Sequence, residues 1–348
     1  MKKLIALLLA LAMVFALAAC GGSSAKEPAA ETPAEAPAAP DAEAPVEAPA
    51  GDVQTAEGLT IAVSTIAYSI AVLPQVLIDN LQALCEANGW EFIMQAAEGD
   101  PMKQGEQIST LVARQPDYLV IFPADPMLAI DWCQEAADNG VPTLCMHVDV
   151  DESCHGTTCV AYCGIDNEAV VTSIFNYMVD NNEADAALNL VEIGGVPDQA
   201  DYIVRTGTFN SLLADSSYTQ LGDIAWAYSS RADAQGYMES FIGTYGDQID
   251  ILVGFDDDLT LGGVNALQEQ GMTDVQVYSI TGQKEAMAAI QNGQMTMTVF
   301  TSTKMIAEKV VEVINRLEAG ESVDYYQYID APVVDASNVA DFVDLAEF

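Results

Sequence analysis

Short apolar runs alternate with longer amphipathic segments over most of this 348-residue chain. The apolar runs, which predict strands, cover 59–64, 91–95, 118–122, 142–147, 186–193, 219–224, 249–253, 275–280 and 296–300. The amphipathic segments, which predict helices, cover 71–88, 101–115, 127–139, 167–181, 200–214, 232–245, 259–271, 284–292 and 303–319. Continuous apolar strands separated by helices are typical of parallel sheets covered on both faces. Because the pattern pauses and resumes after Gly164, it predicts an α/β fold of two doubly wound lobes.

Polar residues follow the expected strands. In open parallel sheets, ligands bind beyond the carboxyl ends of the strands. These ends therefore predict a cleft for a polar ligand, and they fall at 64–65, 123–125, 147–149, 194–195, 256–258 and 281–282.

The first 20 residues have the pattern of an export signal. Lys2 and Lys3 precede an apolar run from residue 4 to 19, which is short for a membrane-spanning helix. Leu-Ala-Ala-Cys closes the run at Cys20, and this resembles the bacterial lipoprotein signal, in which the Cys becomes the lipid-modified first residue. The alternative is an ordinary secretory signal in which the Cys is accidental.

Residues 21–57 are rich in Ala, Pro and acidic residues and hold no large apolar side chain that would build a core. Such a composition predicts a disordered tether. Together with the signal, it predicts a domain on the extracytoplasmic face of a bacterial membrane, held there only by its lipid anchor.

The charge balance excludes several classes of partner. The chain has 11 Lys and Arg against 52 Asp and Glu, a formal net charge of −41. Nucleic-acid binding needs clustered basic residues, and so does electrostatic docking on anionic lipid. We therefore expect neither.

Enzyme motifs are absent from the sequence. It contains no G-x-S-x-G, no H-E-x-x-H, no P-loop and no G-x-G-x-x-G after an expected strand. We therefore predict a protein that is not an enzyme and that uses no cofactor and no metal.

Six cysteines remain after Cys20, at 85, 133, 145, 154, 159 and 163. An even number outside the cell permits disulfides, and a bond from Cys154 to Cys159 or Cys163 would close a short loop. Buried free thiols are the alternative for Cys85, Cys133 and Cys145. A zinc site that includes His147 and His155 is a further alternative, but the spacing C-x4-C-x3-C is not a standard ligand pattern.

From about Leu59 to Val334, a series of segments resembles the periplasmic sugar-binding proteins of the ribose/galactose type, which are substrate-binding components of ABC transporters. Asp117–Asp125 (DYLVIFPAD) is similar to a family segment of the pattern D-x-(apolar)-x-I-x-P-x-D, and Ala136–Pro142 is similar to the family's A-x-x-x-G-I-P turn. The other segments are 61–65, 104–112, 164–167, 205–209 and 255–263.

This resemblance implies the type I periplasmic binding protein fold, in which two similar lobes joined by a three-segment hinge close on a ligand. The expected N-terminal lobe is 58–162 plus 303–330, and the expected C-terminal lobe is 163–302 plus 331–348.

Ligand contacts are implied at nine positions, given by their numbers in this sequence. They are Ser64, Tyr68, His147, Arg205, Trp226, Tyr228, Asp256, Thr281 and Thr301. His147 and Thr281 stand where the family usually has Asp, and Trp226 or Tyr228 would supply an aromatic wall. Arg205 also has a physical argument, because a guanidinium can fork hydrogen bonds to vicinal hydroxyls or to a carboxylate.

We therefore expect a monomeric, lipid-anchored solute-binding protein that captures a small neutral sugar or sugar-like ligand and delivers it to an ABC permease. The alternative is the ligand-binding component of a sensory system, with a furanosyl signal or a nucleoside as its ligand.

Overall fold

Two sheets organise the part of the chain that the computed structural model describes, residues 58–183 and 186–348. These residues belong to a single compact unit, Gly51–Phe348. The expected signal, Cys20 and the tether lie outside the described residues. Among the helices of the described residues, none is long and apolar enough to cross a bilayer.

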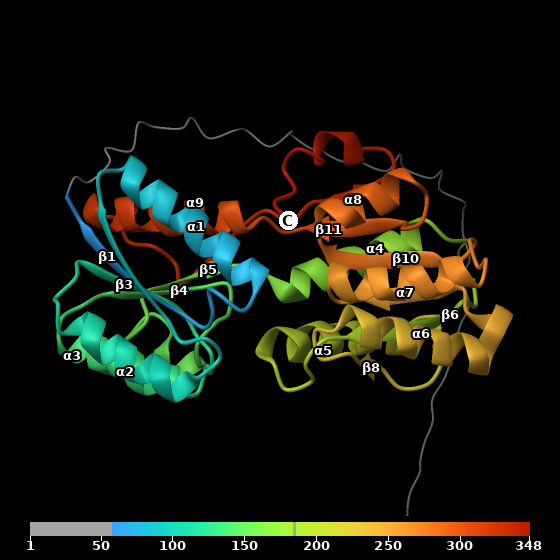
Figure 1. Cartoon of the computed structure of the whole chain (residues 1–348), viewed down its shortest axis with the longest axis horizontal. Coiled ribbons are helices and arrows are strands. Elements are labelled where there is room, and N and C mark those ends of the chain that lie inside the picture. Colours follow the sequence, from blue (N-terminus) through green and yellow to red (C-terminus); the bar gives the residue numbers. More distant parts are fainter. Residues whose placement is uncertain (1–57, 184–185) are drawn as a thin grey trace, which may run out of the picture. The chain divides into compact units, whose positions relative to one another are not determined.

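The first sheet has six strands within the described residues, in the order β12-β5-β4-β3-β1-β2, and all of its pairs are parallel. Helices α1 and α9 lie on one face of this sheet, and α2 and α3 lie on the other (Figure 1). The elements are β1 (Thr60–Thr65), α1 (Val72–Ala87), β2 (Glu91–Ala96), α2 (Pro101–Val112), β3 (Tyr118–Phe122), α3 (Ala129–Asp138), β4 (Thr143–Met146), η1 (Glu152–Cys154), β5 (Ala161–Gly164), α9 (Thr303–Glu318) and β12 (Tyr326–Tyr328).

The second sheet follows the order β13-β11-β10-β9-β6-β7, and β8 also pairs with β6. Helices α4 and α5 cover one face, and α6, α7 and α8 cover the other. The elements are α4 (Asn167–Asp180), β6 (Asn189–Gly194), α5 (Ala200–Ala214), β7 (Thr219–Gln220), β8 (Ala225–Trp226), α6 (Arg231–Tyr245), η2 (Gly246–Gln248), β9 (Ile251–Gly254), α7 (Asp257–Glu269), β10 (Gln276–Thr281), α8 (Lys284–Gln291), β11 (Met297–Phe300), β13 (Val333–Asp335) and η3 (Val339–Asp341).

Successive side chains of each strand enter different layers of the core. In β1, Ile61 and Val63 pack on the side of α1 and α9, whereas Ala62 packs on the side of α2 and α3. A strand alternates its side chains between two faces, so a strand that is buried on both sides reads as a continuous apolar run. The predicted two-lobed α/β fold is therefore confirmed.

The described part of the chain passes between the two sheets three times. It leaves the first sheet after Gly164, returns between Phe300 and Thr303, and crosses again between Tyr328 and Val333. The expected boundary after residue 162 falls inside β5, because Cys163 and Gly164 still pair with β4 and β12. The first lobe therefore extends to Gly164.

The second sheet is parallel except at one edge, where β13 pairs with β11 in the antiparallel direction. One expectation for this sheet is wrong. The expected strand 219–224 is two separate pairs of residues, β7 and β8. Gly222 lies between them with a φ of +77°, a left-handed conformation that turns the chain out of an extended strand.

One buried carboxyl group in this sheet has no hydrogen-bond partner in the part of the chain that the structure describes. Glu192 of β6 is 1% exposed, and neither of its carboxyl oxygens has a hydrogen-bond partner among the described residues. Burial raises the pKa of Glu192 to about 7. The strand thus carries a group whose charged form is costly inside the fold.

The C-terminal tail connects the two lobes. Val339 and Ala346 of the tail pack in the core of the second lobe. Glu347 then accepts hydrogen bonds from the backbone nitrogens of Thr303 (2.7 Å) and Lys304 (2.8 Å) at the start of α9 in the first lobe. Its carboxylate therefore caps α9 across the second crossing.

Candidate functional site

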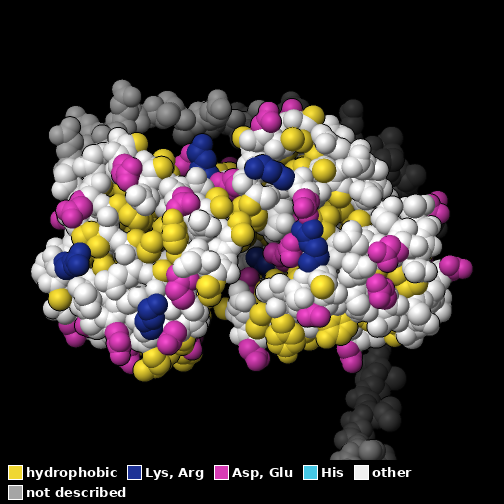
Figure 2. Space-filling model, in the orientation of Figure 1, with side chains coloured by type: hydrophobic (Ala, Val, Ile, Leu, Met, Phe, Trp, Pro, Cys, Tyr) yellow, Lys and Arg dark blue, Asp and Glu magenta, His cyan; other side chains and the backbone are white. Residues whose placement is uncertain are grey.

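A pocket of about 190 Å³ lies where the two lobes meet, beside the first and third crossings. At about 30 Å³ for each water, it has room for about six water molecules, which suits a small solute. The surface is hollowed between the two lobes on the face shown in Figure 2. The lining residues come from both lobes and are His147, Val148, Asp149, Tyr162, Ile165, Asp166, Asn167, Glu168, Ala200, Asp201, Val204, Tyr326 and Tyr328.

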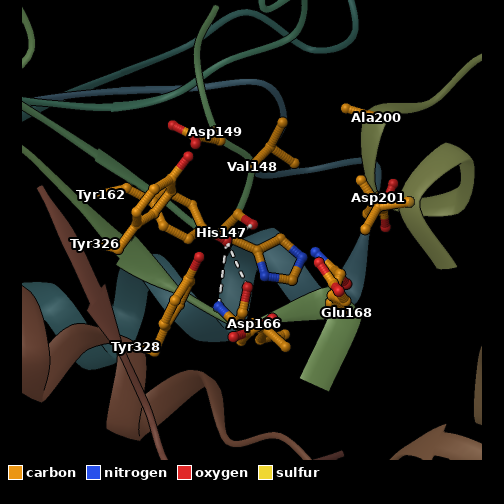
Figure 3. Close-up of a pocket in the computed structure, with 13 residues that line it drawn as sticks. His147, Val148, Asp149, Tyr162, Asp166, Glu168, Ala200, Asp201, Tyr326 and Tyr328 are labelled. Atoms are coloured by element: carbon orange, nitrogen blue, oxygen red, sulfur yellow. Dashed lines mark hydrogen bonds between the residues drawn. The ribbon is translucent and has the colours of Figure 1, made fainter. Parts of the chain in front are cut away.

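His147 stands at the centre of the pocket wall (Figure 3). Its φ is +65°, in the left-handed region, and two backbone contacts hold it there. Its N–H donates to the Cys163 carbonyl (3.0 Å), and its carbonyl accepts from the Tyr162 hydroxyl (2.9 Å). Left-handed conformations of residues other than Gly are often found at functional sites, where the surrounding structure enforces them.

The imidazole of His147 is neutral at physiological pH. Its pKa is lowered to about 4, chiefly by burial; the nearby Asp201 carboxylate opposes this shift and the Arg205 guanidinium adds to it. The ring lies edge-on to Phe122, with 5.0 Å between the ring centroids. Its Nδ1 atom is buried and has no hydrogen-bond partner among the described residues. A neutral ring nitrogen is thus available to a ligand hydroxyl or amine.

Arg205 lies behind the pocket wall and holds two of its lining residues. Arg205 is a residue of α5, and its side chain is buried. Its Nε donates to Asn167 Oδ1 (2.7 Å), and its Nη1 donates to the Phe255 carbonyl (2.8 Å). Nη1 also lies 3.6 Å from Asp201 Oδ2. Asn167 and Asp201 line the pocket, so in this structure Arg205 positions the residues that face it.

Three tyrosines form the opposite side of the pocket from Asp201 (Figure 3). Tyr326 and Tyr328 of β12 stack at 5.2 Å between centroids with 16° between their planes. Tyr162 meets both rings edge-on. Tyr326 is 46% exposed and Tyr328 is 40% exposed, so both leave an aromatic face free for a ligand.

Asp149 closes one end of the pocket with a set of short contacts. Its Oδ1 accepts from the Tyr325 hydroxyl (2.6 Å) and from the Val150 N–H (2.8 Å), and its Oδ2 lies 3.4 Å from His155 Nε2. Burial raises the pKa of this carboxyl group, and the hydrogen bond from Tyr325 opposes the shift. These contacts fix the carboxylate in one orientation at the edge of the pocket.

Of the nine predicted ligand residues, His147 lines this pocket and Arg205 supports it from behind. Four others lie elsewhere in the fold. Ser64 is fully buried and accepts from Gln104 Nε2 (3.2 Å), and the Tyr68 hydroxyl donates to Asp79 (2.6 Å). Trp226 pairs with Gly194 in the second sheet, and Tyr228 is 64% exposed.

The last three predicted residues lie in the second lobe and at the second crossing. Asp256 caps α7 by accepting from the Asp258 N–H (2.8 Å); burial raises the pKa of Asp256 and Arg205 opposes the shift. The Thr301 hydroxyl donates to the Thr281 carbonyl (3.4 Å). None of the three lines the pocket at His147. Their contact with a ligand stays a prediction.

The expected disulfides are wrong for this structure. All six cysteines of the described residues are free and buried. Cys163 points into the core layer of α1 and α9, whereas Cys154 and Cys159 point into the layer of α2 and α3, so the sheet separates Cys163 from the other two. Within the described residues, no three His, Cys, Asp or Glu side chains are arranged to hold a metal ion, and the alternative zinc site finds no support.

Comparison with known proteins identifies the family. Residues 61–322 match the model of a family described as the periplasmic binding protein domain. The chain belongs to this family. The resemblance seen in the sequence is therefore confirmed, and the members of the family are substrate-binding proteins rather than enzymes.

Curated relatives in this periplasmic binding protein family share about a quarter of their residues with the chain. A D-xylose-binding periplasmic protein of Haemophilus influenzae is 27% identical over 251 residues, which cover 69% of this chain and 71% of that protein. A xylitol-binding protein of Mycolicibacterium smegmatis is 23% identical over 263 residues, covering 75% and 73%.

Solved structures of periplasmic binding proteins share the fold. An ABC transporter solute-binding protein from Mycobacterium smegmatis with bound glycerol has a TM-score of 0.71 and 24% identity, covering 82% of this chain and 97% of that one. A galactofuranose-binding protein has a TM-score of 0.73 and 17% identity over the same shares.

Sequence reasoning missed most of the residues that line the pocket of this periplasmic binding protein. Tyr326 and Tyr328, which were not predicted, line this pocket, whereas a ligand contact of Trp226 or Tyr228 stays a prediction. A signal was present in the segment Tyr-Tyr-Gln-Tyr at 325–328. In a strand, Tyr326 and Tyr328 share one face, so three tyrosines in four residues indicated an aromatic surface.

Proposed function

We propose that this chain is an extracytoplasmic, lipid-anchored solute-binding protein that captures a small sugar or sugar-like ligand and delivers it to an ABC permease. The observation that carries this proposal is the pocket at His147. It lies beside the crossings, and its walls come from α5 of the second lobe and from β12 and the loop after β4 of the first.

The wall residues supply both kinds of contact that a sugar uses. Tyr326 and Tyr328 offer aromatic faces to the apolar face of a ring. Asp149, Asp201 and the ring nitrogen of His147 accept hydrogen bonds from hydroxyl groups. The names of several relatives, which include xylose-, xylitol- and ribose-binding proteins, support the same class of ligand.

Closure of the cleft is the proposed mechanism. A ligand that contacts Asp201 of one lobe and Tyr328 of the other binds more tightly when the two lobes approach each other. It therefore shifts the population of the protein toward the closed form. The closed form would then present a surface to the permease, and no bond in the ligand is made or broken.

Delivery to a permease is supported by the solved structures described as solute-binding proteins of ABC transporters. Lipid anchoring is supported by the sequence that ends at Cys20. Metabolic labelling with a radioactive fatty acid tests the anchor directly. The natural chain is expected to incorporate the label and a Cys20→Ala variant to lose it; label retained by the variant would contradict the proposal.

A thermal-shift screen of the purified chain tests the binding function. Its panel contains monosaccharides, polyols, nucleosides and furanosyl signal molecules. A ligand present at 100 times its Kd stabilises the fold by about 2.7 kcal/mol and raises the melting temperature clearly. A sugar or polyol that shifts the melting temperature would support transport. A response to nucleosides or furanosyl signals alone would favour the sensory function instead.

A further inference from the structure

The pocket at His147 is lined by four carboxylate side chains and by no Lys or Arg among the described residues. The four are Asp149, Asp166, Glu168 and Asp201. Arg205 is the cation next to them, and its guanidinium is engaged with Asn167, Phe255 and Asp201 behind the wall. The space that a ligand would occupy thus faces a surplus of negative charge.

Two buried atoms in the wall lack hydrogen-bond partners. They are Asp201 Oδ1 and His147 Nδ1, and neither has a partner among the described residues. A buried polar atom without a partner is costly, and native structures usually supply one. A carboxylate oxygen only accepts hydrogen bonds, and a neutral imidazole nitrogen is able to accept one. The missing partner of Asp201 is therefore a donor.

The aromatic side of the pocket favours the same kind of ligand. The stacked rings of Tyr326 and Tyr328 are partly exposed and lie across the pocket from Asp201 (Figure 3). The face of a tyrosine ring attracts a cation at short range, and a desolvated cation most of all. The ring faces and the carboxylates thus both favour a cationic ligand.

We propose that the ligand of this pocket carries a protonated amine on a small polyhydroxylated frame, as in an amino sugar or an amino polyol. The inference rests on the proposed function, because it takes this pocket as the ligand site. It replaces the neutral ligand expected from the sequence. An anionic sugar is disfavoured, since no described cationic side chain lines the pocket to receive its charge.

Isothermal titration calorimetry with the full chain tests this inference on two matched sets of probes. The first set is D-glucose, D-glucosamine and D-glucuronate, and the second is glycerol and 2-amino-1,3-propanediol. In at least one set the amine is expected to bind 10-fold more tightly than its hydroxyl counterpart. Its affinity should fall as salt is raised from about 0.01 M to 1 M, where the Debye length shrinks from about 30 Å to 3 Å.

Two variants distinguish the effect of the pocket carboxylates on affinity from the effect of the chain's overall negative charge. Glu168→Gln removes one charge at the pocket, in the first turn of α4. Asp233→Asn removes one charge in the first turn of α6, where the residue is exposed and outside the pocket. We expect Glu168→Gln to weaken the amine at least threefold more than it weakens the hydroxyl counterpart, and Asp233→Asn to leave the affinity for the amine unchanged.

The outcomes distinguish this inference from the proposed function. Equal or tighter binding of the neutral probe would leave the proposed function standing but would overturn the inference that the ligand carries a protonated amine. An equal loss in both variants would also overturn it, since the attraction would then belong to the whole acidic surface. If no probe binds, the proposed function and the inference both fail.

Discussion

Glu192 is expected to make the fold less stable as the pH rises through neutrality. This carboxyl group is 1% exposed and has no hydrogen-bond partner among the described residues, and burial raises its pKa from 4.5 to about 7. In the folded state the proton is therefore held more tightly than in the unfolded state. Burying the ionised carboxylate lowers the free energy of unfolding. This loss is absent below the unfolded pKa of 4.5, grows as the pH rises, and is complete above the folded pKa of about 7.

The size of the penalty follows from the two pKa values. One pKa unit is worth about 1.4 kcal/mol, so the ionised group costs on the order of 3 kcal/mol. The variant Glu192→Gln has nearly the same shape and no charge to bury. Its free energy of unfolding should exceed that of the natural protein by about 3 kcal/mol well above pH 7, and the two should agree near pH 4.5.

Urea denaturation of both proteins across this pH range, followed by circular dichroism, measures the difference. Glu91→Gln serves as the control, because Glu91 is an exposed strand residue and its substitution removes the same charge from the acidic chain. A gain that is equal at both ends of the pH range would refute the reasoning. So would an equal gain in the control, since the effect would then come from net charge.

Three further outcomes are expected. Glu347→Ala should lower the free energy of unfolding by about 1–2 kcal/mol in urea denaturation, because the N–H groups of Thr303 and Lys304 at the start of α9 lose their carboxylate acceptor. Arg205→Ala should abolish ligand binding in calorimetry and lower the free energy of unfolding by about 3–5 kcal/mol, because Asp201 keeps a charge without its partner; unchanged affinity would remove Arg205 from the site. Cys85 should react with a thiol reagent only after unfolding, because burial raises its pKa to about 12, and rapid reaction of the native protein would contradict its place in the core.

The arrangement of strands and helices was predictable because burial on two faces leaves a direct trace in the sequence. The strand β3 is apolar at every position and was located to the residue. The prediction of a single strand at 219–224 was wrong. Its apolar residues suggested one element, but Gly222 turns the chain between the two-residue strands β7 and β8. Strand prediction is weakest at such edges, where little burial constrains the pattern.

The pocket was harder to predict than the fold. His147 was predicted from the family resemblance and from its place after an expected strand, where ligands of parallel sheets bind; it lines the pocket, and its contact with a ligand stays a prediction. Tyr326 and Tyr328 reach the pocket from a strand near the end of the chain, and only the pairing of β12 with β5 brings them there. Pairing between segments so far apart in the sequence is a tertiary property, which no local pattern reports.

The crossings between the sheets also determine which parts of this chain can fold independently. The first lobe is discontinuous, because α9 and β12 follow the whole α/β part of the second lobe. Leu77 and Leu81 of α1 pack in one cluster with Ile306 and Val310 of α9. Without α9, the side of α1 that packs against it would be exposed to solvent. Cutting the gene after Gly164 would therefore not release a first lobe able to fold alone.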